Sequence, residues 1–453
     1  MQPPKHQSPR PGPRSQRDGL RLAAGADVRL RALQALLAIQ EGHGSQAALR
    51  AVLDQPPVLQ GPDRGLATEL VYGTLRLCEP LDRWITPQCT QGLTGLEPAV
   101  VWALRLGALQ LTLGRVPAYA AVDTTLDALR AHRGPGRGPL GFVHAVLRKL
   151  ATRMEQGDGP TGPVVPDWLA RRVRLRAAEL GVDGEAWLQA LAEPAPLHLH
   201  VPGPNPEQVL QTLNPACLGE RLPVPGTAVA TAAIFASEAF ARREVVLQDV
   251  ASAAVARLIA VAPGEPVLDV AAGRGIKSLT LAAGGAQVTA LDLSEVKLAA
   301  AQSLLATAGL SLQTVVADAA RPLPAPADHY AAVLVDAPCT ALGTVRRRPE
   351  VRLRRQAADL QRMAQLQQQM LRHAAICVRP GGQLVYAVCS FAQEEGPDVI
   401  ADFLRQHPQF HREPLPAWLA GVVTVDGDLA SHPLWHGADA FYAASLRRQP
   451  LDT

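Results

Sequence analysis

The feature that most constrains the fold is an alternation of short apolar runs with longer helical patterns, from about residue 244 onward. The apolar runs have the length and composition of buried strands, and the stretches between them have helical periodicity. Strands that alternate with helices form a parallel sheet with helices on both faces. We therefore expect an α/β domain over 241–453, with strands at 266–270, 287–291, 313–316, 331–335 and 383–388 and helices at 294–308 and 355–379.

The part of the chain before this alternation has three kinds of composition. Apolar residues at three- and four-residue spacing predict an all-helical domain over 25–153. A Gly/Pro-rich linker over 154–165 then leads to a small mixed α/β domain at 166–240. Residues 1–24 contain Pro, Gln, Ser and Arg with few apolar side chains, which is typical of a disordered basic tail. A chain of 453 residues has room for these several domains.

The composition argues against several classes of protein. None of the six cysteines belongs to a C-x-x-C pair, so we expect no metal site. The N-terminus lacks the apolar segment of a signal peptide, and no apolar run of about 18 residues suggests a membrane span. The net charge of +3 is small, but the basic charge is mostly arginine, which suits phosphate. We expect a cytoplasmic monomer with free thiols.

Two cysteines follow predicted strands. Cys339 comes after the run 331–335, and Cys389 comes after the run 383–388. Open α/β sheets bind ligands outside the carboxyl ends of their strands, so we expect both thiols in one cleft. One thiol can add to an electrophilic ring carbon and the other can help it leave, which suits methylation at a pyrimidine C5. The alternative, a small buried hydrophobe, describes Cys377 better than these two residues.

A small-residue loop after the first strand suits a nucleotide-like cofactor. Gly273 and Gly275 lie in this loop, where small residues let the backbone approach a ligand. Asp292 ends the next strand about twenty residues later, a spacing that suits a ribose diol. Ser278 replaces the third glycine of a G-x-G-x-x-G fingerprint, and Asp318 follows another strand. Together these residues favour S-adenosylmethionine (SAM) over NAD, although Asp318 fits a turn or capping residue equally well.

Six arginines lie within the ten residues 346–355, directly after the Cys339 loop. This density of guanidinium groups beside the expected cleft indicates contacts with RNA phosphates. The alternative is a solvated helix start. The residues that we assign to RNA binding are Arg346, Arg347, Arg348 and Arg352.

These motifs together resemble the RNA cytosine-C5 methyltransferases. Residues 336–339 match the D-A-P-C signature of that family. Cys389 and Ser390 match its T-C-S motif, with Val388 in place of the threonine. The segment 269–278 resembles the family's D-x-C-A-A-P-G-G-K-T loop. The pair of cysteine motifs is the most specific part of this resemblance.

The rest of the chain extends the resemblance. The helical domain resembles the antitermination factor NusB, and 141–148 looks like its accompanying G-F-V-N-A-V-L-R segment, with His144 in place of Asn. Residues 248–252 resemble a Q-D-x-x-S segment, and 437–443 resemble a G-x-D-G-F-F-x-A ending. A NusB-like RNA-binding domain followed by a methyltransferase domain resembles the RsmB/Sun/Fmu type of bacterial enzyme that acts on 16S rRNA.

The resemblance implies SAM as the cofactor. The loop departs from the family at Gly273, Arg274 and Ile276, which stand in place of Ala, Pro and Gly. Ile276 is expected to add a β-branched side chain where the backbone approaches SAM, whereas Lys277 keeps the lysine of the family. The residues implied in cofactor binding are Ala271, Ala272, Gly273, Arg274, Gly275, Ile276, Lys277, Asp292, Asp318 and Asp336.

The resemblance also implies a substrate and a mechanism. A cytosine of small-subunit rRNA, as naked RNA or in an assembling particle, leaves its stack. Cys389 adds to C6, Asp336 hydrogen-bonds N3, and Cys339 assists the departure of Cys389. Two alternatives stay open. An NAD-dependent oxidoreductase explains Asp292 but neither cysteine, and a non-catalytic RNA-binding factor would carry a degenerate cofactor loop.

Overall fold

The computed structural model describes residues 26–134 and 139–450, so the expected basic tail at 1–24 lies outside the described residues. The chain divides into two compact units, one ending at Thr161 and the other beginning at Gly162. The division falls inside the Gly/Pro-rich stretch 154–165. Among the described residues, no helix is long and apolar enough to cross a membrane.

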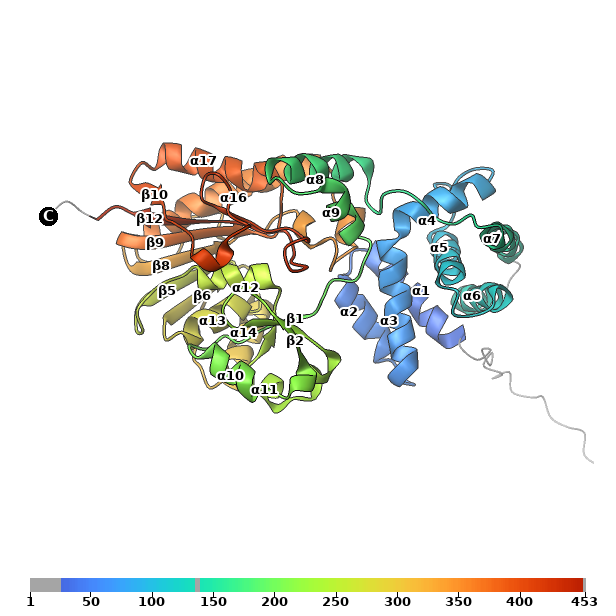
Figure 1. The fold of residues 1–453 in the computed structure, drawn as a ribbon, viewed down its shortest axis with the longest axis horizontal. Helices are drawn as coiled ribbons and strands as arrows, with labels where there is room; N and C mark the ends of the chain where they lie inside the picture. The colour runs from blue at the N-terminus through green and yellow to red at the C-terminus, as the bar shows by residue number, and fades with distance from the viewer. Residues whose placement is uncertain (1–25, 135–138, 451–453) are drawn as a thin grey trace, which may run out of the picture. The chain divides into compact units, whose positions relative to one another are not determined.

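The first unit is all-helical in its described residues, as the periodicity predicts (Figure 1). Leu33 and Leu36 of the first helix and Leu104 of the fifth are fully buried in its core. Gly107 lets the fifth and seventh helices approach, because a Cβ there would lie 2.6 Å from a methyl group of Leu147. The helices are α1 (Ala26–Gln40), α2 (Ser45–Leu53), α3 (Gly61–Arg76), α4 (Cys78–Ile85), α5 (Pro98–Leu113), α6 (Ala118–Arg133) and α7 (Leu140–Glu155).

The second unit begins with a small mixed region. Its four-stranded antiparallel sheet has the order β2-β3-β1-β4. The last of these strands lies beyond residue 240, where we expect the mixed segment to end. The elements are α8 (Asp167–Glu179), α9 (Gly184–Ala190), β1 (His198–His200), α10 (Pro206–Thr212), β2 (Leu218–Arg221), β3 (Thr227–Ala230), α11 (Glu238–Ala241) and β4 (Val246–Leu247).

The larger sheet of the second unit confirms the predicted α/β architecture. Its strands follow the order β10-β12-β9-β8-β5-β6-β7, and the five strands from β9 to β7 are parallel to their neighbours in this series. The five predicted strands correspond to β5 (Pro266–Val270), β6 (Gln287–Asp292), β7 (Gln313–Val316), β8 (Tyr330–Asp336) and β9 (Val378–Val388).

Three further strands near the C-terminus extend this sheet with antiparallel pairs, which the sequence pattern did not reveal. They are β10 (Phe410–Arg412), β11 (Leu429–Ala430) and β12 (Tyr442–Arg448). Both β10 and β11 are too short to show a period, and β12 is buried over its first five residues, so its alternation is weak.

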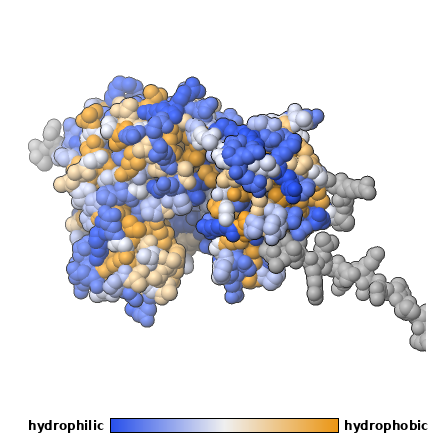
Figure 2. Space-filling view, turned by 45° about the vertical axis from the view of Figure 1, so that its right-hand side comes forward, coloured by the Kyte–Doolittle hydropathy of each residue, from blue (hydrophilic) through white to orange (hydrophobic). Residues whose placement is uncertain are grey.

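Helices cover both faces of the larger sheet (Figure 1). Leu334 packs into the core on one face, whereas Val333 and Val335 pack into the core on the other, because successive side chains of a strand point to opposite faces. Burial of each such side chain contributes about 1.5–3 kcal/mol. One face carries α12 (Val250–Arg257), α13 (Ile276–Ala283) and α14 (Glu295–Thr307), and the other carries α16 (Ala358–Cys377) and α17 (Pro397–Gln406). On the outer surface, hydrophobic residues are interspersed among hydrophilic ones (Figure 2).

Candidate active site

The structure brings the two predicted thiols into contact. Cys339 follows β8 and Cys389 follows β9, and these neighbouring parallel strands pair up to the register of Asp336 with Ala387. The two Sγ atoms are 3.3 Å apart, and both side chains are partly exposed. Parallel strands place their carboxyl ends at the same edge of the sheet, which is why residues fifty positions apart meet.

A glycine closes the loops around these thiols. The amide of Gly343 donates to the carbonyl oxygen of Cys389 at 3.1 Å, and the amide of Ala440 donates to the carbonyl oxygen of Gly343 at 3.0 Å. A Cβ at this position would lie 1.7 Å from the Ala440 oxygen. No other residue fits at position 343 without moving the backbone that holds Cys389.

The pKa of the Cys339 thiol is raised well above its usual value. The largest cause is its hydrogen bond with Cys389, followed by burial and by the nearby charges of Cys389 and Glu395. Cys339 is therefore a thiol, not a thiolate, at neutral pH. A protonated sulfur next to Cys389 can donate a proton but is a poor nucleophile.

A pocket of about 440 Å³ lies at the same edge of the sheet. Asp292, Asp318 and Asp336 line it from the ends of β6, β7 and β8. The remaining lining is mostly apolar, with Ala271, Leu291, Leu293, Ala317, Ala319, Ala320, Pro338, Leu366 and Met370, together with Lys297. Carboxylates in an apolar pocket fit a cofactor that has a sugar diol, a flat ring and positive charge, as SAM has.

The small-residue loop supports this pocket more than it lines it. The amide of Gly273 donates to Asp292 at 3.0 Å, so the loop and the carboxylate fix one another. Gly275 has a φ of 78° and lies against Ala301, where a Cβ would approach within 2.6 Å. Gly275 is therefore required for helix packing. Ala271 lines the pocket, and Asp318 also accepts from a backbone amide in a turn, as its alternative interpretation predicts.

The departures of the loop from the family pattern point away from the pocket. Ile276 packs against the apolar core under α13, and Arg274 is exposed. Neither they nor Ala272 are among the residues that line the pocket. The side chain of Ile276 thus does not fill the volume in which we expect SAM.

Lys277 and Asp336 form an ion pair, with Nζ 2.7 Å from Oδ2. Lys277 is only 9% exposed. Burial opposes its charge, but Asp336, Asp269 and Cys389 outweigh that effect and raise the pKa of Lys277. The neighbouring Asp269 is fully buried, and its second carboxylate oxygen lacks a hydrogen-bond partner among the described residues. Burial raises the pKa of Asp269 to about 7.

The predicted RNA-binding arginines fall into two groups. Arg346 is buried and donates to the carbonyl oxygen of Pro194 at 3.1 Å, and Arg352 is buried and donates to Val164. Arg347 pairs with the buried Asp249 at 2.9 Å and Asp439 at 3.3 Å. These three arginines join parts of the second unit to one another.

Arg348 differs from those three arginines. Its side chain is 51% exposed, and its nearest carboxylate, Glu350, is 3.6 Å away. A phosphate can therefore reach its guanidinium group. The prediction of RNA contact is best retained for Arg348.

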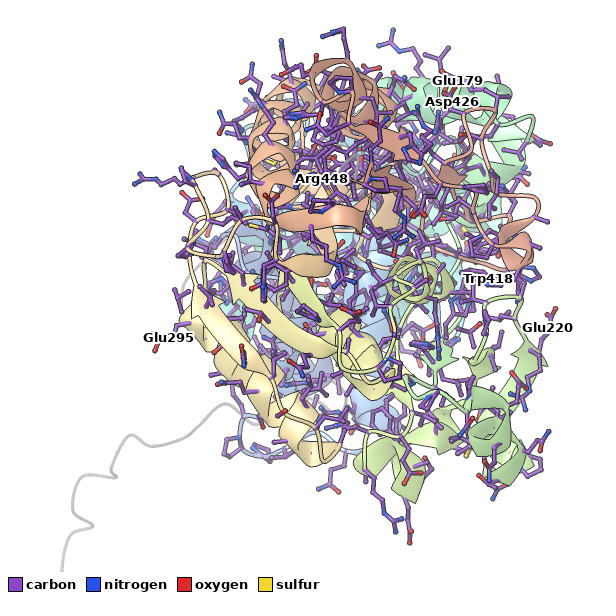
Figure 3. All side chains as sticks on the ribbon, turned by 90° about the vertical axis from the view of Figure 1, so that its left-hand side faces the viewer. Glu179, Glu220, Glu295, Trp418, Asp426 and Arg448 are labelled. Carbon is purple, nitrogen blue, oxygen red and sulfur yellow. The ribbon has the colours of Figure 1, made fainter. Side chains whose placement is uncertain are left out.

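A second pocket, of about 480 Å³, lies within the second unit and is lined by α8 and the segment 421–432. Glu179 and Asp426 lie close together at its rim (Figure 3). Its lining residues include neither of the two thiols nor the strand-end acids of the first pocket. Among the described residues, no group of three His, Cys, Asp or Glu side chains is arranged to hold a metal ion.

Some site residues escaped the sequence reasoning. Leu293 lines the first pocket although it is 72% exposed, and only its place after the strand-end Asp292 could have indicated it. Met370 reaches the same pocket from a helix, where it looks like an ordinary core residue. Glu395 is fully buried beside the thiols, and the sequence could have indicated it only as an acidic residue shortly after Cys389.

Comparison with known proteins identifies the families that the two units resemble. Residues 256–447 match the family described as 16S rRNA methyltransferase RsmB/F, and residues 26–152 match the NusB family. A Thermus thermophilus protein named Ribosomal RNA small subunit methyltransferase B is 36% identical over 430 residues, which cover 92% of this chain and 96% of that protein. A Pasteurella multocida protein of the same name is 29% identical, with coverage of 92% and 96%.

A solved structure shows the same fold. The crystal structure of PH0851 matches with a TM-score of 0.76 at 24% identity, covering 94% of this chain and 99% of that one. The close similarity in sequence to the Thermus protein extends over both units. The chain therefore belongs to the RsmB-type 16S rRNA methyltransferases, in which a NusB-family region precedes the methyltransferase domain.

Proposed function

We propose that this protein methylates C5 of a cytosine in 16S rRNA, with SAM as the methyl donor and Cys389 as a covalent nucleophile. The observation that carries the proposal is the 3.3 Å contact between Cys339 and Cys389, where Cys339 directly follows Pro338 of the pocket that Asp292 and Asp336 also line. A single thiol would suffice for many reactions. Two thiols in contact suit a reaction in which one must add to a ring and then leave.

The pocket residues account for the cofactor. Asp292 would accept hydrogen bonds from a ribose diol, and Leu291, Leu293 and Met370 would give apolar contact to a flat ring, since all four line the pocket. When bound there, SAM supplies an electrophilic methyl group. Asp318 and Asp336 add negative charge that favours a sulfonium cation.

The remaining residues carry the chemistry on the base. Cys389 forms a bond to C6, which makes C5 nucleophilic. As the adduct forms, N3 takes up a proton from water and donates a hydrogen bond to Asp336, which Lys277 holds at 2.7 Å. After methylation C5 gives its proton to water, and the electron pair of that C–H bond restores the C5–C6 double bond as the bond between C6 and Cys389 breaks. N3 returns its proton to water, and the Cys339 thiol donates a proton to the departing sulfur and regains one from solvent. The Lys277 ammonium balances the charge of a Cys389 thiolate before attack.

We assign RNA recognition to two parts of the chain. The NusB-like region over 25–153 would bind the rRNA, with His144, Arg148 and Lys149 on the exposed side of α7. Arg348 would contact a phosphate near the pocket. The small mixed region at 166–240 holds the arginine segment in place through the carbonyl oxygen of Pro194.

Bisulfite sequencing of 16S rRNA tests the proposal. Bisulfite converts cytosine but spares 5-methylcytosine, so cells that lack the protein should show one newly converted position. The wild-type gene should restore protection, and Cys389→Ala should not. Equal protection in cells with and without the protein would contradict the proposal and favour a non-catalytic RNA-binding factor.

A further inference from the structure

A buried carboxylate lies behind the two thiols. Glu395 ends the short helix η5 (Gln393–Glu395) and is 0% exposed. It accepts hydrogen bonds from the amide of Thr340 at 2.7 Å and from the Thr340 hydroxyl. It also accepts from the Ser390 hydroxyl at 2.5 Å and from Nε2 of Gln367 at 3.2 Å. Thr340 directly follows one cysteine of the pair and Ser390 directly follows the other.

This network fixes the two cysteine loops against each other. Nε2 of Gln367 also donates to the carbonyl oxygen of Pro338 at 3.0 Å, just before Cys339. The hydroxyl of Tyr386 donates to the backbone oxygen of Glu395 at 2.6 Å, which anchors η5 to β9. Burial of a carboxylate costs several kcal/mol unless hydrogen bonds compensate it, and here every bonded partner is a donor. These four hydrogen bonds compensate the burial of the Glu395 side chain.

The charges around the two thiols are unequal. The carboxylate of Glu395 is among the causes that raise the pKa of Cys339, after the Cys389 hydrogen bond and burial. On the other side, burial opposes the charge of Lys277, while Asp336 and Cys389 support it. A negative group thus acts on Cys339 and a positive group acts on Cys389.

We propose that Glu395 is a positioning residue that gives the two thiols their separate roles. Its hydrogen bonds hold the sulfurs in contact, and its negative charge opposes ionisation of Cys339, which leaves Cys389 to act as the nucleophile. This inference rests on the proposed function, because the roles are those of the nucleophile and of the proton donor in its release. Cys339 keeps its proton during attack and has it available when the bond from Cys389 to C6 breaks.

The first test uses the unmodified full-length protein without RNA. Iodoacetamide reacts with thiolates, so its rate at each cysteine reports ionisation. Mass spectrometry of the two peptides would follow alkylation from about pH 6 to about pH 10. We expect Cys389 to react about tenfold or more faster than Cys339 near neutral pH. Equal rates, or a faster Cys339, would overturn the proposal without any variant.

The second test removes the charge and keeps the shape. In Glu395→Gln the amide oxygen can still accept from the Thr340 and Gln367 N–H groups, and its NH₂ can donate to the two hydroxyl oxygens. We expect alkylation of Cys339 to rise about tenfold at a fixed pH, with a smaller change at Cys389. An equal change at both cysteines, or none, would show that Glu395 is only structural.

Matched variants complete this test. Glu394→Gln changes the neighbouring carboxylate, which is partly exposed and pairs with Arg172 at 2.7 Å, and it should leave both rates as they are. Glu395→Asp keeps the charge, so Cys339 should stay slow even though the shorter side chain loosens the loops. Rapid alkylation of Cys339 in Glu395→Asp would count against the role of charge. This measurement tests the proposal even if Glu395→Gln does not fold.

A parallel assay separates this inference from the proposed function. If Cys389→Ala still methylates RNA, the covalent mechanism fails, whereas the effect of Glu395 on the two alkylation rates stands. If Cys389→Ala is inactive but Glu395→Gln leaves the alkylation rates unchanged, only the inference about Glu395 fails. For methylation itself, Glu395→Gln should lower kcat and leave the KM for RNA near the wild-type value.

Discussion

The strand-end cysteines and the arginine segment 346–355 both stand out in the sequence, but the fold treats them differently. Cys339 and Cys389 meet, with their sulfurs 3.3 Å apart, at the carboxyl ends of β8 and β9. Arg346 and Arg352, by contrast, point into the protein and bond backbone carbonyl oxygens. The position of a residue at a strand end is fixed by the sheet, because parallel strands share an edge. The partner of a long charged side chain in a loop depends instead on which acceptor groups the folded chain brings near it.

The largest expected effect tests the two strand-end cysteines. Cys389→Ala should lower methylation by roughly 10³-fold or more, since the neighbouring Cys339 has a raised pKa and is a poor replacement for the nucleophile. Cys339→Ala should still attack the base but release it slowly. A denaturing gel with radiolabelled RNA and SAM should therefore show a protein–RNA adduct in Cys339→Ala and none in Cys389→Ala. The opposite pattern would reverse the two roles, and full activity in both variants would make the thiols structural.

The next largest effect tests the arginines of the segment 346–355 that bond within the protein. Arg347→Ala leaves two buried carboxylates without their cation and should lower the free energy of unfolding by about 3–5 kcal/mol in urea denaturation. Arg348→Ala, in which an exposed arginine is lost, should change it by less than about 0.5 kcal/mol. Equal losses would show that the inward and outward arginines do not differ.

The same variant carries a pH signature. Burial and Asp249 raise the pKa of Asp439 to about 7 in the folded protein. The folded state therefore holds a proton that the unfolded chain releases above about pH 4, so this group stabilises at low pH and loses that contribution as the pH rises toward 7. Burial opposes ionisation of Asp249, but His198 and Arg347 lower its pKa. Without Arg347 both acids resist ionisation more strongly, and the destabilisation should be larger at pH 8 than at pH 5.

A moderate effect is expected at a strand-end acid. Asp292→Ala should weaken SAM binding by about 1–3 kcal/mol in calorimetry, because the ribose and the amide of Gly273 both lose an acceptor. Glu295→Ala is the control, since this exposed acid at the start of α14 does not line the pocket. Unchanged affinity in Asp292→Ala, or an equal loss in both variants, would count against the assignment of Asp292 to the ribose.

The smallest effect concerns the one arginine of the four that we retain for RNA. Arg348→Ala should weaken RNA binding across sequences and reduce the salt slope by about one unit or less. Arg405→Ala, another exposed arginine far along the chain on α17, is the matched control and should leave the slope unchanged. If both variants give the wild-type slope, Arg348 makes no phosphate contact.

The pattern of apolar runs predicted the parallel part of the sheet well, because a strand buried on both faces must be apolar along its length. The runs at 266–270 and 331–335 lie in β5 and β8, which are buried over most of their length. The C-terminal strand β12 escaped because it ends in two arginines after five buried residues, and neither feature marks a strand by itself.

The sequence alone also placed both thiols and the acids Asp292 and Asp336 at strand ends, since each follows an apolar run directly or within four residues. Tertiary structure alone decided which side chains share a partner. It paired Lys277 with Asp336, buried Glu395 between the cysteine loops, and turned Ile276 toward the core. Such contacts join residues far apart in sequence, and their energies depend on burial and on distances that no local pattern encodes.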